Sequence, residues 1–438
     1  MEGGSGVLIM EVSAIFKLAI VFVLMLAAIR RGISLGNTFV MSSVLLGVLF
    51  GLDATSMAAS ALSSVLSSRT IALCAVVSLI LILSTSMEVS GHMSGLLANF
   101  RGMVRSPRVN LAIFPALIGL LPMPGGAVFS APMVREIGAS TSLGPHELSY
   151  VNYWFRHVWE YWWPLYPGII LAVALADVGL WTAVIYLFPL TLVALGAGYY
   201  PLAGNRLSSE HAGETGRPPI WPFIRELVPI LLVIVMGFGL GEIPALLLPG
   251  WFPAKDAALV LSLAAASGWV WARNRLDAGT IRSIILSPKL LGMIYMVASI
   301  MVFQGVMEDS RAVEAVSAEL KRLSVPLVAV VMMLPFMVGA IMGITVAFVG
   351  STFPILIALL VSLGKGDILL PYLMLALVSG FVGVLLSPLH LCLLLSNKYF
   401  GASMRGVYRY LWLPSAAILA SAVLYFVLSL LVVESFMR

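Results

Sequence analysis

Long apolar runs recur along the whole chain, and they constrain its fold more than any other feature. A run of roughly 17 to 25 apolar residues can cross the ~30 Å hydrocarbon core of a bilayer as one helix. By this length rule we expect about ten to twelve spans. Hydrophobic residues make up 61% of the sequence and charged residues 10%, and the mean hydropathy is +1.04. Soluble domains do not have this composition. The sequence therefore predicts an all-α polytopic protein of the cell membrane.

Charge and cysteine content exclude several classes of function. The net charge is +5, but the Lys and Arg residues are scattered over short connections, which indicates positive-inside topology and no nucleic-acid partner. The N-terminus, "MEGGSGVLIMEV", carries acidic residues before its apolar run, so we expect a retained first span. Cys74 and Cys392 lie in apolar runs, where cysteine behaves as a small hydrophobe. We expect no disulfide, no metal site and no cofactor.

The two halves of the chain share landmarks in the same order. A polar linker at residues 204–220 separates them. "MEVS" at 87–90 matches "MEDS" at 307–310, "FSAPMV" at 129–134 matches "STFPIL" at 351–356, and "EYWWPLYPG" at 160–168 matches "LLSPLHLC" at 385–392. The offsets are 220, 222 and 224 residues, as the printed numbering gives. We therefore predict two repeats, residues 1–203 and 221–438.

The basic connections indicate that the second repeat is inverted in the membrane. Arg30, Arg31 and the loop at 101–108 carry the basic residues of the first half. In the second half they fall at 273–289, which matches the nearly uncharged segment 53–68. An inverted repeat enters the bilayer from the opposite side, so its basic loops occupy non-equivalent positions.

Each half also contains helix breakers inside an apolar region. The first set is "LPMPGGAVFSAPMV" at 121–134. Irregular backbone at membrane depth is tolerated only where protein shields it or where it lines a cavity. We therefore predict a re-entrant helical hairpin at about 111–135 and a second at about 333–363, whose tip region runs from Gly343 to Thr352. The alternative is that Pro and Gly only kink ordinary spans.

A discontinuous transmembrane helix is predicted after each hairpin, at about 150–176 and about 369–397. The first contains "VNYWFRHVWEYWWPLYPG", in which His157 and Glu160 share a helical face. Ionisable residues inside a span are costly and usually functional. An aromatic segment of this kind also fits a helix at the headgroup interface, with Arg156 and Glu160 solvated. The sequence leaves these two alternatives open.

A helix end exposed at mid-membrane offers unpaired amides and partial positive charge to an anion. The breaks therefore define our candidate site. The substrate-binding candidates are Pro124, Gly125, Gly126, Ser130, Asn152, His157, Thr345, Gly350, Ser351, Thr352, Ser387 and His390. The candidates for a coupling ion are Glu160, Glu88 and Glu308, although a Glu that closes an apolar run more commonly ends a span at the interface.

The motifs "LPMPGGAVFSAPM", "NYWFRHVWEYWWPLYPG" and "GITVAFVGSTFPI … LSPLHLCL" together resemble the prokaryotic membrane proteins catalogued as domain of unknown function number 401. That family is similar to the ion-transporter superfamily of gluconate, citrate and dicarboxylate carriers. The resemblance implies a homodimeric secondary transporter with an elevator mechanism. The Ser-Asn-Thr tip signature of sodium-coupled dicarboxylate carriers is absent, so neither substrate nor coupling ion follows from the resemblance.

Three functions compete at this stage. The leading hypothesis is a secondary active transporter for a small, carboxylate-like anion, coupled to protons or sodium by symport. An intramembrane enzyme would use His146, Glu147, His157 and Glu160, but no His-Glu-x-x-His motif is present. A channel would also use re-entrant loops, but channels are generally rings of identical subunits, so an inverted duplication favours alternating access.

Overall fold

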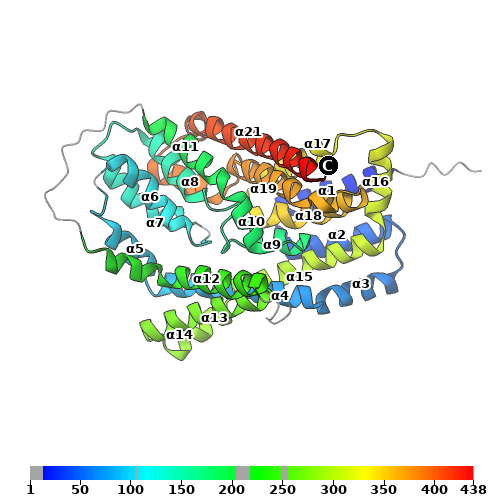
Figure 1. Ribbon diagram of the computed structural model, residues 1–438, viewed down its shortest axis with the longest axis horizontal. Helices are drawn as coiled ribbons and strands as arrows, with labels where there is room; N and C mark the ends of the chain where they lie inside the picture. Colours follow the sequence, from blue (N-terminus) through cyan, green and yellow to red (C-terminus); the bar gives the residue numbers. More distant parts are fainter. Residues whose placement is uncertain (1–12, 105, 124, 204–217, 248–254, 438) are drawn as a thin grey trace, which may run out of the picture.

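The computed structural model describes residues 13–104, 106–123, 125–203, 218–247 and 255–437. Within these ranges the chain is helical, with one short 3-10 helix and no β-strand (Figure 1). The prediction of an all-helical protein is confirmed. The helices are α1 (Ala14–Arg30), α2 (Leu35–Leu49), α3 (Ala54–Leu66), α4 (Ser68–Val89), α5 (His92–Phe100), α6 (Pro107–Gly119), α7 (Ala127–Gly138), α8 (Pro145–His157), α9 (Pro167–Ala176), α10 (Leu180–Leu187), α11 (Pro189–Ala203), α12 (Ile220–Leu247), α13 (Lys255–Asn274), α14 (Ala278–Ile285), α15 (Pro288–Asp309), α16 (Ala312–Arg322), α17 (Leu327–Met342), α18 (Thr345–Ser362), α19 (Leu369–Leu385), α20 (Leu391–Phe400) and α21 (Met404–Met437).

Seven stretches among the described residues are long and apolar enough to cross a membrane. They are Ser68–Val89, Leu180–Tyr200, Ile220–Gly239, Ala278–Asp309, Thr345–Ser362, Gly366–Leu385 and Met404–Val433. The sequence count of ten to twelve is higher because it includes shorter apolar helices, among them α2 and α17. These findings make the chain a multi-pass membrane protein.

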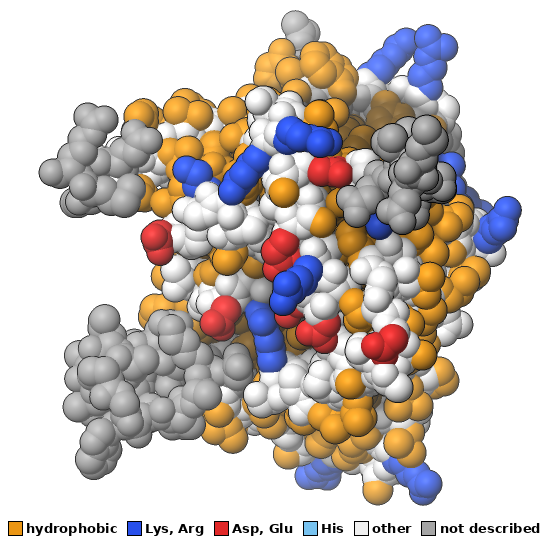
Figure 2. Space-filling model, turned by 90° about the vertical axis from the view of Figure 1, so that its right-hand side faces the viewer, with side chains coloured by type: hydrophobic (Ala, Val, Ile, Leu, Met, Phe, Trp, Pro, Cys, Tyr) orange, Lys and Arg blue, Asp and Glu red, His pale blue; other side chains and the backbone are white. Residues whose placement is uncertain are grey.

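The distribution of side chains fits this conclusion. In Figure 1 the helices α4, α12 and α21 run along the long axis of the molecule. Figure 2 shows one end of that axis, where most of the acidic and several basic side chains lie over the middle of the face, and apolar side chains, with a few basic ones, lie at its margins. Charged end faces and apolar sides are what a bilayer selects. We therefore take the long axis as the direction that crosses the membrane.

The centre of the molecule is formed by helices that are apolar on all sides. In α19 every residue from Pro371 to Leu385 is buried, and α9 is buried along almost its whole length. By contrast, only 17% of the most apolar window of α21 is buried. A helix without a polar face has to pack inside the protein or face lipid. The central position of α9 and α19 fixes where the two interrupted helices lie.

Two connections expected to be loops are helical instead. Segment 53–68 contains α3 and segment 273–289 contains α14. In each case an aspartate caps the helix: the Asp53 carboxylate accepts from the Ser56 amide, and the Asp277 carboxylate accepts from the Thr280 amide. An N-cap Asp satisfies an amide that the helix leaves unpaired, so it favours the start of a helix at each of these positions.

The breakers separate helices in both halves. In the first half, α6 ends at Gly119 and α7 begins at Ala127, and the two helices pack together. In the second half, α17 ends at Met342, Gly343 takes a left-handed conformation with φ of 66°, and α18 begins at Thr345. The expected tip region Gly343–Thr352 is therefore wrong. Only Gly343 and Ile344 separate the two helices. A single left-handed glycine is enough to end α17, and the apolar residues that follow Ile344 form a new helix at once.

The two later helices are interrupted as well. Residues 158–166 separate α8 from α9, and residues 386–390 separate α19 from α20. Pro167 opens α9, where a missing amide hydrogen costs nothing. The interruptions lie deep in the protein: Tyr161 and Ser387 are fully buried.

Candidate functional site

Both turns and both interruptions meet at one cavity of about 310 Å³. Pro122, Met123 and Gly125 come from the first turn, and Gly343 and Ile344 come from the second. The interruptions contribute the residues on either side of the two gaps, and α4 and α15 complete the wall. The other lining residues are Leu81, Arg156, His157, Glu160, Tyr166, Pro167, Gly168, Lys289, Met293, Thr345, Val346, Leu389, His390, Leu391 and Cys392.

Helix N-termini converge on this cavity. The first residues of α9, α18 and α20 line it, and α7 begins two residues after Gly125. The first amides of a helix have no partner within that helix and carry partial positive charge. In the first half, the C-terminal end of α6 is covered. Carbonyl oxygens at this end accept hydrogen bonds from the indoles of Trp159 and Trp163 and from the hydroxyl of Tyr166. The helix ends that remain open therefore favour an anion.

Arg156 adds a buried positive charge to the wall. Arg156 is 3% exposed. Its guanidinium donates to the carbonyl oxygens of Ile118 at 3.2 Å and Met123 at 2.5 Å. The alternative in which Arg156 is solvated at the headgroup interface is wrong, because the surrounding aromatic segment is itself buried. Gly126 makes room for this side chain: a Cβ atom there would lie 2.5 Å from the guanidinium carbon.

Two histidines and an acid lie beside Arg156. His157 Nε2 and His390 Nε2 are 3.0 Å apart, and both residues are buried. His157 Nε2 lies 3.9 Å from a carboxylate oxygen of Glu160, whose side chain is 12% exposed. The other carboxylate oxygen of Glu160 accepts a hydrogen bond from the Thr345 hydroxyl at the start of α18. These contacts join the first interruption, the second interruption and the second hairpin.

His157, His390 and Cys392 bring two ring nitrogens and a thiol within 4.8 Å of one another. By donor type and distance this set could hold a transition-metal ion. Two observations argue against that use. The two Nε2 atoms already bond to each other, and Arg156 and Lys289 line the same cavity and disfavour a further cation. We therefore treat the histidines as a hydrogen-bonded pair.

Several predicted residues line the cavity, and others hold helices together nearby. Gly125, His157, Glu160, Thr345 and His390 line it. Gly126 supports it through Arg156. Pro124 lies outside the described residues.

Ser130 and Asn152 do not line the cavity; they belong to a buried network. The Ser130 hydroxyl donates to the Asn152 side-chain oxygen at 2.6 Å, and the Asn152 amide donates to the Ser396 hydroxyl at 2.9 Å. This network fastens α7, α8 and α20 to one another. It is one turn removed from the first helix break.

Two hydroxyls of the second hairpin, those of Ser351 and Thr352, lie within α18 and not at its tip. Ser351 donates to the carbonyl oxygen of Ala347 and Thr352 to that of Phe348, each at 2.8 Å. Gly350 allows α18 to pack closely on Ile300 of α15. Ser387 lies in the second interruption, where its hydroxyl accepts from the Leu389 amide at 3.3 Å.

Neither Glu88 nor Glu308 lines the cavity. Both are exposed, at the ends of α4 and α15. The Glu308 carboxylate accepts from the side-chain amide of Gln304 at 2.8 Å. It also lines a separate polar hollow with Ser63, Ser64 and Ser67. Their position at helix ends fits the commoner role of a Glu that closes a span.

Sequence reasoning missed Lys289 and Cys392 and left Arg156 open. Lys289 was assigned to a loop but lies in the first turn of α15, exposed at the cavity rim. Its signal would have been Ser287-Pro288, an N-cap followed by proline. Nothing in the sequence around Cys392 distinguishes it from an ordinary core cysteine.

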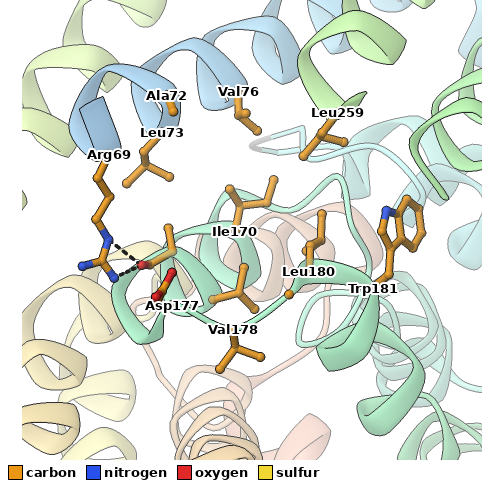
Figure 3. Close-up of a pocket in the computed structure, with 13 residues that line it drawn as sticks. Arg69, Ala72, Leu73, Val76, Ile170, Asp177, Val178, Leu180, Trp181 and Leu259 are labelled. Carbon is orange, nitrogen blue, oxygen red and sulfur yellow. Dashed lines mark hydrogen bonds between the residues drawn. The ribbon is translucent and has the colours of Figure 1, made fainter. Parts of the chain in front are cut away.

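A second cavity of about 340 Å³ lies at the far end of α9, between α4, α10 and α13 (Figure 3). Apolar side chains from α4, α9 and α10 make most of its wall. Its two charged groups are Arg69 and Asp177, and the guanidinium of Arg69 is engaged with the carbonyl oxygen of Ala174. None of the predicted site residues lines this cavity. We therefore assign the site to the cavity at the helix breaks.

The residues considered for an enzyme do not form one cluster. His146 and Glu147 lie at the start of α8 and His157 at its end, about 16 Å apart at 1.5 Å per residue. The His146 ring lies 3.1 Å from the Ser403 hydroxyl, and the Glu147 carboxylate accepts from the backbone amide of Gly144, the N-cap of α8. His146 and Glu147 therefore have structural roles.

The fold defines a multi-pass membrane protein with one cavity at its helix breaks. The chain belongs to the family described as "Protein of unknown function (DUF401)", which it matches over residues 11–432. This confirms the family resemblance. No curated protein matches the sequence. Among solved structures, the crystal structure of the YdaH transporter from Alcanivorax borkumensis is similar, with a TM-score of 0.58 and 15% identity, over 90% of this chain and 97% of that one. At this identity the likeness concerns the fold alone.

Proposed function

We propose that the protein is a secondary active transporter that moves a small carboxylate-like anion across the cell membrane by alternating access, coupled to protons or sodium. One observation carries the proposal: four helix breaks meet at a single cavity that holds a buried Arg156 and the starts of several helices. Helix N-termini and a buried guanidinium are the groups that recognise a carboxylate where water is excluded.

The helix bounds support two inverted repeats. The helices α4 and α15 begin 220 residues apart, as do α5 and α16, and α6 and α17, whereas α8 and α19 are 224 apart, as are α9 and α20. Contacts are exchanged between the halves, since α4 packs on α13 and α15 on α2, and α5 packs on α12 and α16 on α1.

Figure 1 adds an indication of the inversion. It places α5, α6, α7 and α14 toward one end of the long axis. Their counterparts α16, α17, α18 and α3 lie toward the other end. Hairpins entering from opposite sides and meeting at the middle are the expected arrangement of an inverted repeat.

The same arrangement favours an elevator. The hairpins and interrupted helices would form the mobile transport domain, and α4 and α15, which close the cavity on one side, would belong to a fixed scaffold. In this proposal two copies of the chain associate through their scaffolds as a homodimer. Lys289 and Met293 on α15 would then lose their contact with the substrate when the transport domain moves.

A thermal-shift screen tests the function. Purified protein is heated with carboxylates, phosphate, sulfate, sugars and amino acids, with and without sodium and at two pH values. A ligand that binds only the native state raises the melting temperature by mass action. We expect a shift with one class of carboxylate. A shift with neutral or cationic solutes alone would refute the proposal that the substrate is an anion. Flux that does not saturate would indicate a channel.

Gly126→Leu locates the site. The new side chain would occupy the space of the Arg156 guanidinium, so we expect the anion-dependent shift to disappear while folded protein remains in the membrane. Gly196→Leu is the matched control, because a side chain at this exposed position of α11 meets nothing within 4 Å. An anion shift that survives Gly126→Leu would place the site elsewhere.

A further inference from the structure

The hydrogen bonds of the two buried histidines fix where their protons lie. His157 Nδ1 is 2.6 Å from the carbonyl oxygen of Tyr153. A carbonyl oxygen only accepts, so Nδ1 of His157 carries a hydrogen, and in the neutral ring Nε2 has a free lone pair. His390 Nε2, 3.0 Å away, must then donate to it. The remaining nitrogen, Nδ1 of His390, is buried and has no hydrogen-bond partner among the described residues.

This arrangement accepts a first proton more readily than a second. The first proton binds Nδ1 of His390, and the bond between the two Nε2 atoms persists as a stronger, charge-assisted bond from imidazolium to imidazole. A second proton would have to bind Nε2 of His157, where it would face the N–H of His390 at 3.0 Å. Two interacting titratable groups of this kind behave as one unit.

Some groups around the two histidines favour a bound proton, and others oppose it. Glu160, with its carboxylate 3.9 Å from His157 Nε2, favours the proton. Arg156 on α8 and Lys289 on α15 oppose it. Cys392 on α20 and Tyr166 before α9 line the same cavity, and the ring of Tyr153 packs against both imidazoles, with centroids 4.6 and 5.2 Å away. The Tyr408 hydroxyl of α21 donates to the carbonyl oxygen of Leu386, which precedes His390 in the second interruption.

We propose that His157 and His390 form a proton-binding dyad that takes up one proton for each anion carried. For its coupling role the inference rests on the proposed anion transport. The bound proton adds positive charge to the wall of the cavity and so strengthens anion binding, and by linkage the anion strengthens proton binding equally.

The proton also reaches the second hairpin through Glu160. The carboxylate is shared between the dyad and the hydroxyl of Thr345 in the first turn of α18. A charged dyad draws the carboxylate toward His157 and weakens its bond to Thr345. Proton binding thereby changes what holds the start of α18.

The first experiment needs no substrate. The chain has five histidines, so 15N-histidine NMR of the purified protein can follow each ring, with His157→Gln and His390→Gln used to assign the signals. At about pH 8 we expect an Nδ1–H ring for His157 and an Nε2–H ring for His390. As the pH is lowered, the pair should take up one proton in total. Uptake of two protons, or of none, would overturn the dyad.

His146→Gln is the control, since His146 lies at the other end of α8 and contacts Ser403. It should leave the signals of the dyad unchanged. A disturbance as large as that caused by His390→Gln would overturn the assignment. The wild-type titration alone decides the proton count even where a variant folds poorly.

The second experiment measures coupling. Protein in vesicles that enclose a pH-sensitive dye is supplied with gluconate, citrate or succinate. We expect one proton to enter with each anion, and we expect His390→Gln to lose proton entry while the wild type retains it. Anion uptake with undiminished proton entry in His390→Gln would refute the coupling role. If no probe is carried, the NMR titration still decides the dyad, and only the transport proposal fails.

Discussion

The two halves of the chain make the same backbone contact and then fill the space beside it in opposite ways. Gly119 of α6 packs on the carbonyl oxygen of Arg156 in α8, and Gly339 of α17 packs on that of Gly380 in α19; at either glycine a Cβ atom would collide with the oxygen. Gly119 and Gly339 are 220 residues apart and Arg156 and Gly380 are 224 apart, the offsets of the surrounding helices.

Beside this contact the large and small residues change places. In the first half, Arg156 on the interrupted helix fills the space left by Gly126 at the hairpin. In the second half, Phe348 on the hairpin helix packs on the space left by Gly380 on the interrupted helix. The offset of 222 that aligns "FSAPMV" with "STFPIL" also pairs Gly126 with Phe348. The same backbone arrangement therefore carries a charge in one half and an aromatic ring in the other.

The two halves therefore contribute different chemical groups to the cavity. The first half supplies Arg156, His157, Glu160 and the start of α9. The second half supplies Lys289, Thr345, His390 and the starts of α18 and α20. Closely packed glycines fix the geometry in both halves, so the side chains beside them are free to differ. Four predictions test this comparison, from the largest expected effect to the smallest.

Arg156→Met should weaken anion binding most. It removes the buried charge found only in the first half, and losing one member of a buried, charge-assisted contact costs about 3 kcal/mol, roughly 150-fold in Kd. Titration with the carboxylate identified in the screen measures the change. Arg135→Met is the control, because Arg135 is exposed and stacks on Tyr399 outside the cavity. An unchanged Kd in Arg156→Met would remove the guanidinium from the site.

Gly119→Ala and Gly339→Ala should destabilise the protein to a similar extent. A methyl group at either position meets a backbone carbonyl that cannot move aside, and overpacking costs about 1 to 3 kcal/mol. Thermal unfolding in detergent measures both. The control is Gly292→Ala on α15, which meets nothing within 4 Å and should be neutral or stabilising, since Ala favours a helix by up to about 1 kcal/mol. If Gly339→Ala melts like Gly292→Ala, the two contacts are not equivalent.

Thr345→Val should loosen the connection between the halves. It removes the hydroxyl that donates to Glu160, and a bond of this kind to a charged acceptor contributes about 1.5 kcal/mol. We expect a lower melting temperature and a weaker effect of pH on anion binding. Thr345→Ser keeps the hydroxyl and should behave like the wild type. Identical behaviour of the Val and Ser variants would contradict the role of this bond.

The smallest effect concerns the contact between α16 and α1. The Glu319 carboxylate accepts from the Ser13 hydroxyl at 2.5 Å and from the amides of Ile15 and Ala14 at 3.0 and 2.9 Å. These hydrogen bonds, the one from Ser13 first, lower the pKa of Glu319 below its ordinary 4.5. The stabilisation is therefore complete above about pH 4.5 and is lost as the pH falls through the lowered pKa.

Glu319→Gln tests this contact, since it removes the charge and keeps the size of the side chain. Its melting temperature should be slightly lower than that of the wild type at neutral pH and should converge with it in acid. A difference that does not depend on pH would contradict the assignment.

Much of the architecture followed from local patterns. Apolar run length predicted the membrane helices, because a bilayer leaves a helix as the simplest way to satisfy every backbone group. Dense Pro and Gly marked where helices stop, since these residues remove a donor or permit left-handed backbone. The interruption between α8 and α9 and the first turn at Pro122–Gly126 were visible in the sequence for this reason. The second turn was placed only roughly, because one left-handed glycine gives a weaker signal than a cluster of prolines.

The site depended on contacts that no local pattern encodes. Ser351 and Thr352 are predicted as ligands beside a breaker, but inside α18 their hydroxyls donate to carbonyl oxygens four residues earlier in the same helix. The burial of Arg156 was undecided, because an aromatic segment with charges has the same composition at an interface and in a core. The partnership of His157 with His390 links residues 233 positions apart. The sequence by itself determined a helical membrane protein and where its helices break. Only the tertiary structure decided which side chains share the cavity, because burial and charge pairing are set by neighbours distant along the chain.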